Sequence, residues 1–202
     1  MFIGCHPEQW FNAAIVGNAQ FIQAHLKTFA KRHDHRSASD TVYPGFTALM
    51  YACLNNHDDV FKLLLQQEYE EVTSHTVTIN KIKLHQDSTI AHILSATQHT
   101  ALCDNLVHTM RLVQVSLQKL IGKQNGLGQT ATIIGLLNNN LTWACAPNVM
   151  HAELFQVTED RFSPLTLACY CGRVEYLRAF MQIYQKAAAA QSPDLSQMMK
   201  ML

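Results

Sequence analysis

The stretch GFTALMYACLNNHDDVFKLLLQQE, residues 45–68, has the pattern of two short helices joined by a tight turn. Thr47 is a good N-cap for the first helix, and the Asn55-Asn56 pair ends that helix in residues that tolerate a left-handed turn. Asp58 suits the positive end of a second helix, whose leucines form an apolar face. Because neither helix can bury its apolar side chains alone, the pair has to pack on neighbouring elements.

Segments similar to this one recur along the chain. With TALMYACLNNH from Thr47 as the reference, the matches are TIAHILSATQH from Thr89, TATIIGLLNNN from Thr130 and SPLTLACYCGR from Ser163, at spacings of 42, 41 and 33 residues. Near the N-terminus, WFNAAIVGNAQFIQAHL from Trp10 fits the same frame. The sequence therefore predicts about five helix pairs that stack on one another.

Composition limits the classes of function. With 202 residues, 48% of them hydrophobic, the chain is long enough for one ordered domain with a sizeable core. Fifteen Lys and Arg residues balance fifteen Asp and Glu residues, so no overall positive field favours nucleic acid. The longest apolar run, ATIIGLL at 131–137, is too short to span a bilayer, and six cysteines without a secretory signal suggest a reducing compartment. We expect a cytoplasmic monomer that binds no nucleic acid and does not insert into a membrane.

The repeated segments resemble the ankyrin repeat family. The family signature is a Thr-Pro-Leu-His start, paired small residues, a Gly-His turn and a Leu-rich second helix. It appears piecemeal as TALM, AC, NNH and KLLL in residues 45–67, and Ser163-Pro164-Leu165 and Gly172 carry parts of it again. The resemblance covers roughly residues 7–185. It implies an all-α, ankyrin-type helix-turn-helix solenoid of about five repeats with finger-loop insertions.

The domain boundaries follow from this register. Apolar spacing extends the second helix of the third unit to about Gly122. The limits from 141 to 155 stay open, because Pro147 falls inside an expected helix. Residues 186–202, in which Ser192 can cap an apolar helical pattern, are either a terminal cap helix or the start of a further region. The predicted repeat domain spans 1–185, with units near 7–28, 45–67, 87–122, 128–155 and 161–185.

Insertions lengthen the connections between the first three units. The first, at residues 27–44, is polar and rich in turn residues. In the second, at 68–88, apolar residues alternate around Asn80-Lys81, which predicts a β-hairpin. The alternating residues are Val77, Ile79, Ile82 and Leu84. A basic run of Lys27, Lys31, Arg32 and Arg36 and an acidic run of Glu68, Glu70 and Glu71 both indicate solvated insertion surface.

No residue pattern indicates catalysis. The chain has no Gly-rich phosphate loop and no arrangement of Ser, His and Asp or of Cys, His and Asn that the sequence alone would place together. His33-Asp34-His35-Arg36 is a compact ligand-like cluster, but no second set of ligands follows at a zinc-like spacing. A metal-responsive protein that uses His33 and His35 is the weaker alternative. We therefore predict no enzyme, no cofactor, and no catalytic, cofactor-binding or metal residues.

The remaining histidines have structural places in the resemblance. His57 and His99 take the turn slot of the ankyrin signature, and His92 takes its start slot. There the resemblance implies hydrogen bonds to the backbone and to the helix cap.

The resemblance also implies a protein partner. In the family, variable first-helix positions and finger tips line a concave surface that binds proteins. Several of these slots are apolar here, and a contiguous exposed apolar patch usually marks an interface. The alternative is that the insertions fold over this strip and bury it. The candidate partner-binding residues are Phe46, Tyr51, Leu54, Asn55, Ile93, Thr97, Ile134, Asn138, Phe162, Leu167 and Tyr170.

The predicted function is a non-catalytic protein-protein interaction module that binds a protein partner through its concave helix and finger surface. The divergent repeats and irregular insertions also resemble ankyrin proteins that intracellular bacteria or protists deploy in host cells, which suggests a host-directed effector. The alternative is the docking or substrate-presenting part of a longer enzyme.

Overall fold

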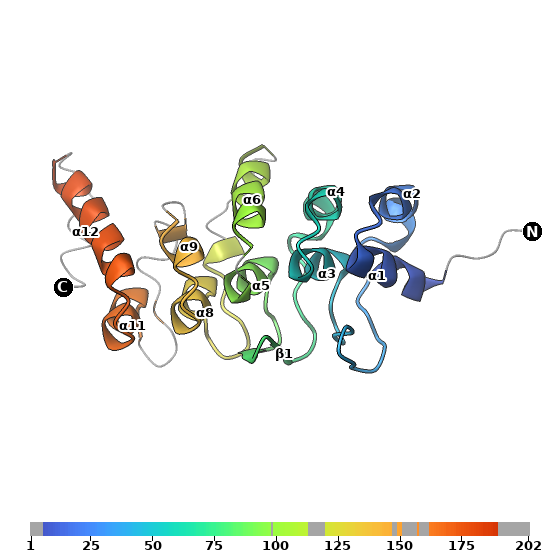
Figure 1. The fold of residues 1–202 in the computed structure, drawn as a ribbon, viewed down its shortest axis with the longest axis horizontal. Coiled ribbons are helices and arrows are strands. Elements are labelled where there is room, and N and C mark those ends of the chain that lie inside the picture. The colour runs from blue at the N-terminus through green and yellow to red at the C-terminus, as the bar shows by residue number, and fades with distance from the viewer. Residues whose placement is uncertain are drawn as a thin grey trace, which may run out of the picture.

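Helices dominate the computed structural model, which describes residues 6–97, 99–112, 120–146, 149–150, 157 and 162–189. They form successive pairs, each with a first and a second helix (Figure 1). The predicted mostly helical fold is therefore confirmed. The pairs are α1 (Pro7–Val16) with α2 (Ala19–Phe29), α3 (Ala48–Leu54) with α4 (Asp58–Glu68), α5 (Ile90–Ala96) with α6 (Thr100–Leu112), α8 (Ala131–Leu137) with α9 (Leu141–Ala144), and α11 (Pro164–Tyr170) with α12 (Val174–Ala189).

The pairs stand in one row, with the N-terminal pair at one end and the C-terminal pair at the other (Figure 1). First helices contact first helices in the order α1, α3, α5, α8 and α11. Second helices contact second helices in the order α2, α4, α6, α9 and α12. Each pair therefore buries its apolar side chains partly within itself and partly against its neighbours in the row.

The matching sequence segments start their helices at the same residue. Thr47, Thr89, Thr130 and Ser163 are the N-cap residues of α3, α5, α8 and α11, and each has an extended backbone. The Ser163 Oγ accepts a hydrogen bond from the backbone N–H of Thr166 at 3.1 Å. This bond satisfies one of the N–H groups that the first helical turn leaves without a partner.

The turn within a pair uses a residue in the left-handed region. The φ angle is 78° at Gly17, 58° at Asn56, 57° at Asn139 and 65° at Gly172. Glycine and asparagine are the residues that adopt this conformation most readily. At Gly17 space also excludes a side chain, because an added Cβ would lie 2.6 Å from the Nδ1 of His57.

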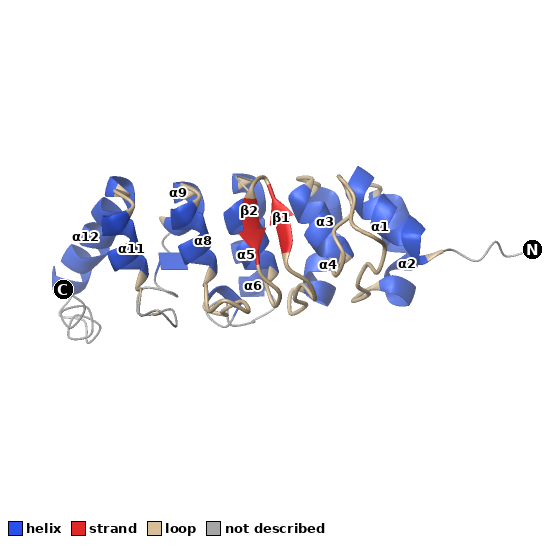
Figure 2. Ribbon diagram, turned by 90° about the horizontal axis from the view of Figure 1, so that it is seen from below, coloured by secondary structure: helices blue, strands red, loops and turns tan. Residues whose placement is uncertain are grey.

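The second insertion contains the predicted β-hairpin. Strand β1 (Val77–Ile79) pairs antiparallel with β2 (Ile82–Leu84). Asn80 and Lys81 form the two-residue turn, with φ angles of 49° and 69°, as hairpins of this length require. Figure 2 shows the two strands in front of the helices, and β2 contacts α5. The strands' buried side chains thus attach the hairpin to the row of first helices.

Two hydrophobic clusters form the core. The larger one extends from Trp10 through the first three pairs to Val149, and the smaller one joins α8 and α9 to α11 and α12. Helix α8 contributes to both, with Ile134 in the larger cluster and Ile133 in the smaller. The core therefore continues along the row through side chains that neighbouring pairs share.

Several predictions concern residues outside the described part. The proposed continuation of the third unit's second helix to Gly122 includes 113–119, which lie outside it, and so do Pro147 and residues 190–202. The predicted unit limits stay predictions. Within the described residues, no helix is long and apolar enough to cross a membrane.

Candidate protein-binding surface

Six of the candidate partner-binding residues are buried. They are Phe46, Tyr51, Ile93, Thr97, Ile134 and Leu167, and none is more than 8% exposed. The expectation that these side chains form an exposed strip is therefore corrected. Tyr51 shows the physical reason, because Tyr43 and Asp34 of the first insertion lie against its ring and its hydroxyl group. At Tyr51, this is the alternative in which an insertion covers the strip.

Asp34 ties the first insertion to α3. The Tyr51 hydroxyl donates to Asp34 Oδ2 at 2.8 Å. Arg36 donates to the same carboxylate through Nε at 3.0 Å and Nη2 at 2.7 Å, and its Nη1 donates to Asn12 Oδ1 at 2.7 Å. Burial alone would raise the pKa of Asp34, but the hydrogen bonds from Arg36 and Tyr51 outweigh it and hold this pKa below its ordinary value. The insertion is thus fastened by one buried, fully hydrogen-bonded carboxylate.

Glu68 is also buried, which corrects the expectation that the whole acidic run is solvated surface. Its side chain is at the end of α4, and the residue is 1% exposed. Its carboxylate accepts hydrogen bonds from the backbone N–H groups of Leu49, at 2.8 Å, and Lys31, at 3.0 Å. Burial raises the pKa of this carboxyl. Glu68 therefore holds the start of α3 and the end of the preceding pair in place.

The ligand-like histidine cluster makes structural contacts. His33 Nδ1 donates to the backbone carbonyl of Gly45 at 2.9 Å, and its Nε2 lies 3.2 Å from Glu71 Oε2. The carboxylate of Asp34 is occupied by Arg36 and Tyr51. Among the described residues, no group of three or more His, Cys, Asp or Glu side chains is arranged to hold a metal ion.

The histidines in the signature slots make the expected backbone and cap bonds. His57 Nε2 donates to the carbonyl of Ile15 at 2.8 Å, and His99 Nε2 donates to that of Leu54 at 3.1 Å. His92 Nδ1 accepts from the backbone N–H of Thr89 at 3.0 Å. Burial lowers the pKa of His92 to about 4, so its ring is neutral at pH 7. The prediction that the signature histidines bond to the backbone and to the helix cap is confirmed.

An asparagine and an arginine occupy the slot of His57 and His99 in the last two pairs. Each also donates to backbone carbonyls at the end of the preceding first helix. Asn140 Nδ2 donates to the carbonyls of Ser95, at 3.1 Å, and Thr97, at 2.5 Å. Arg173 Nε donates to the carbonyl of Leu136 at 2.8 Å, and its Nη2 reaches the carbonyl of Leu137. Sequence reasoning missed both residues, although they repeat the slot of His57 and His99 at the spacings of the repeated segments. These bonds place the C-terminal ends of the first helices side by side along the row.

The side chains at these helix ends form the candidate surface, here called the helix-end row. Tyr170 is 85% exposed, Val16 70% and Leu137 47%. Four members are candidates from the sequence; of these, Asn55 and Tyr170 are exposed and Leu54 and Asn138 are partly buried. Phe162 is 48% exposed, but it lies just before the N-terminal end of α11 and is therefore outside the row. The helix-end row consists of Val16, Leu54, Asn55, Leu137, Asn138 and Tyr170.

The pair α3 and α4, with its flanking loops, matches a known family model. The model is that of the ankyrin repeat, and it covers residues 44–74. The chain carries an ankyrin repeat. No curated protein matches the chain. Within this repeat, α3 is the first helix, α4 is the second, and His57 begins the second helix as its N-cap residue.

Replacing Asn140 by alanine is expected to lower the free energy of unfolding by about 2 kcal/mol, since it removes the α9 cap and leaves buried carbonyls unpaired. Urea denaturation followed by circular dichroism measures this change. The matched control is Asn138→Ala, because among the described residues the Asn138 side chain donates to a carbonyl of its own helix, that of Ile134. Equal effects of the two substitutions would mean that the bond between pairs adds nothing.

Proposed function

We propose that the chain is a non-catalytic protein-recognition module built from about five divergent ankyrin repeats with finger-loop insertions. The match at residues 44–74 supports one repeat directly. The shared N-cap position, the left-handed turn and the slot that bonds to the preceding helix support the same assignment for the other pairs. Ankyrin repeats bind protein partners, so a protein is the expected ligand.

The observation that carries the binding surface is the exposure of apolar side chains at the helix-end row. Tyr170 and Leu137 come from adjacent helices, α11 and α8, whose ends Arg173 joins. Tyrosine combines an apolar ring with a polar hydroxyl and is among the residues that dominate interfaces, and here it is exposed at the end of a helix next to the one that carries Leu137. The contact area would therefore centre on the C-terminal half of the row, with Asn138 as a polar contact at its edge.

A binding experiment tests this surface against the loop side. The variant Leu137→Asp/Tyr170→Asp is expected to lose at least tenfold in affinity for a partner captured by the unmodified chain, because it places two charges in the contact area. Leu127→Asp is the matched control, since Leu127 is 50% exposed but lies in the loop before α8. Titration of purified partner by calorimetry measures both.

The opposite pattern would contradict the helix-end row. If Leu127→Asp abolishes binding and the double variant does not, the partner contacts the loops. Folding of each variant is checked by circular dichroism, because an unfolded variant reports nothing about a surface.

The other parts of the predicted function stay predictions. These are a host-directed effector role and, as the alternative function, the docking or substrate-presenting part of a longer enzyme. A monomeric, cytoplasmic protein without affinity for nucleic acid remains the expectation from composition.

A further inference from the structure

The first insertion is closed at a narrow neck. The backbone N–H of Asp34 donates to the carbonyl of Phe46 at 2.8 Å, and the N–H of Gly45 donates to the carbonyl of Asp34 at 2.7 Å. His33 lies next to these two bonds, and residues 37–41 beyond them are all exposed. The bonds therefore help to hold the insertion in place. The residues of the neck are His33, Asp34, Gly45 and Phe46.

His33 joins the neck to the second insertion. Its Nδ1 lies 2.9 Å from the carbonyl oxygen of Gly45, and its Nε2 lies 3.2 Å from Oε2 of Glu71 in the second insertion. The side chains of His33 and Glu71 are 24% and 25% exposed, so water reaches the contact only in part. One imidazole ring thus bridges two segments that are 38 positions apart in the sequence.

The two contacts need one proton more than a neutral ring supplies. A carbonyl oxygen only accepts a hydrogen bond, so Nδ1 of His33 carries a proton. In a neutral imidazole Nε2 is then a bare acceptor that faces the acceptor oxygen of Glu71. One further proton between Nε2 and Oε2 satisfies both contacts, as in an imidazolium, which donates from both nitrogens. We propose that His33 and Glu71 form a proton-dependent latch on the neck, which is closed by this proton and loosens without it.

The pH dependence of the latch has a definite sign. Histidine changes its charge between about pH 5 and pH 8. The protonated ring makes the hydrogen bond to Glu71, so its contribution to stability is present at the lower end of this window and is lost as pH rises through it. The ion pair of Asp34 with Arg36 persists across the window, because hydrogen bonds hold the pKa of Asp34 below its ordinary value. A higher pH therefore weakens the neck without releasing the whole insertion.

Glu68 is a second source of pH dependence near the latch. Burial, and to a smaller extent the charge of Glu71, raises the pKa of Glu68, whose carboxylate accepts from the backbone N–H of Lys31. Its contribution to stability also falls as pH rises. A test of the latch therefore has to separate His33 from Glu68. The charged and titratable groups around His33 are Lys31, Arg32, Asp34, His35 and Arg36 in the first insertion, Glu68 at the end of α4, and Glu71 and His75 in the second insertion.

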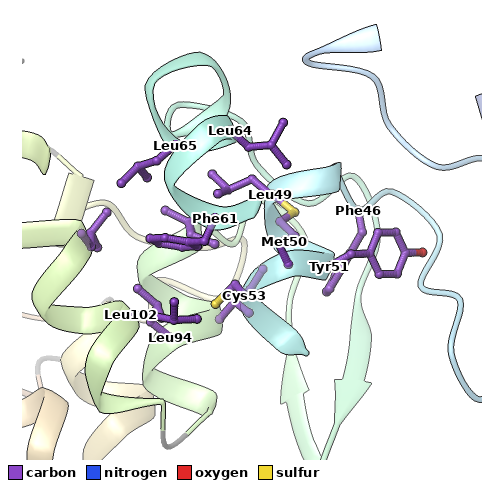
Figure 3. Close-up of a cluster of buried hydrophobic side chains, with 14 of the residues drawn as sticks. Phe46, Leu49, Met50, Tyr51, Cys53, Phe61, Leu64, Leu65, Leu94 and Leu102 are labelled. Carbon is purple, nitrogen blue, oxygen red and sulfur yellow. The ribbon is translucent and has the colours of Figure 1, made fainter. Parts of the chain in front are cut away.

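The neck carries part of the cover over α3. Phe46 and Tyr51 lie side by side (Figure 3), with ring centroids 5.4 Å apart. The backbone N–H of Tyr43 donates to the Tyr51 hydroxyl at 2.8 Å. When the neck opens, these groups leave the ring of Tyr51. The latch is therefore expected to set, through pH, how often this covered part of the first helix becomes accessible.

Amide hydrogen exchange followed by NMR tests the latch in the full chain. Protection factors, which correct for the direct effect of pH on exchange, are expected to fall about threefold from pH 5.5 to pH 8 at Asp34, Gly45 and Tyr43. This is the size of effect that a partly exposed ion pair produces. The amide of Arg173, which donates to the carbonyl of Ala168 in the C-terminal pair, reports global unfolding and is expected to stay unchanged.

Two substitutions remove the proton dependence in different ways. His33→Gln removes the titrating ring, so the three protection factors are expected to stay constant with pH. Glu71→Gln supplies an N–H donor to the unprotonated Nε2 of His33, so protection at pH 8 is expected to remain at its level at pH 5.5. His35→Gln and His75→Gln replace exposed histidines of the two insertions. They are the matched controls and are expected to keep the change of about threefold.

Two results would overturn the proposal. Protection factors that stay constant or rise between pH 5.5 and pH 8 in the unmodified chain show that no proton closes the neck, and this measurement needs no variant. A fall that persists in both His33→Gln and Glu71→Gln assigns the pH dependence to Glu68 or to another group. Neither result bears on the helix-end row, because the measurement involves no partner.

Discussion

Replacing Asp34 by alanine is expected to lower the free energy of unfolding by about 3–5 kcal/mol, because it removes the buried acceptor of the first insertion. The variant leaves the guanidinium of Arg36 only partly solvated, with 21% of its side chain exposed, and leaves the hydroxyl of Tyr51 in the core without this acceptor. Urea denaturation followed by tryptophan fluorescence measures the loss. Trp10 is a suitable reporter, since it lies in the pair that Arg36 contacts through Asn12.

The smaller substitution Tyr51→Phe is the matched control. It keeps the buried ring, whose centroid lies 5.4 Å from that of Phe46, and removes only the hydroxyl, which donates to Asp34. The same hydroxyl accepts from the backbone N–H of Tyr43 at 2.8 Å, so two hydrogen bonds are lost and the expected cost is about 2 kcal/mol. If Asp34→Ala costs no more than Tyr51→Phe, the carboxylate does not fasten the insertion.

The effect of Asp34 depends on pH in a defined direction. The folded-state pKa of Asp34 is lowered, so its contribution to stability is present above the unfolded carboxyl pKa of about 3.9 and is lost as pH falls through the folded value. The pH dependence of Glu68 has the opposite sign, since burial raises its folded-state pKa. Its contribution to stability is lost as pH rises through that folded-state pKa. The difference in the free energy of unfolding between wild type and Asp34→Ala is therefore expected to become smaller below pH 4.

The sequence predicts what local chemistry determines. Thr47, Thr89, Thr130 and Ser163 were found as helix starts because a cap residue acts on its own first turn. The hairpin at 77–84 was found because alternation and a two-residue turn lie within one segment. These features depend on neighbours in sequence, so a pattern of residue types is enough to locate them.

What the sequence did not predict depends on contacts between distant segments. Tyr51 occupies a slot that is exposed unless an insertion covers it, and the covering residue, Asp34, lies 17 positions away in a polar loop. Glu68 looks like one member of a charged run until the backbone of Lys31 is placed beside it. Asn140 and Arg173 repeat the role of His57 with different side chains, so a search for one residue type does not find them.

Replacing Phe61 by alanine is expected to lower the free energy of unfolding by about 3–5 kcal/mol and to separate the unfolding of the two halves of the row. Phe61 is 0% exposed and lies between the second and third pairs, against Leu94 and Leu102 (Figure 3). In a stacked array, stability is approximately the sum of the units and of the interfaces between neighbours. A cavity at this interface therefore weakens the coupling between the halves as well as the second pair itself.

The two tryptophans allow the halves to be followed separately. Trp10 is in the first pair and Trp143 in the fourth, and both are 0% exposed. With Trp143→Phe or Trp10→Phe as background, fluorescence reports the N-terminal or the C-terminal half in urea. The two midpoints are expected to move apart in Phe61→Ala and to stay unchanged in Gln66→Ala, which alters an exposed side chain of the same helix. If the midpoints in Phe61→Ala shift together by the same amount, the interface at Phe61 does not limit the coupling along the row.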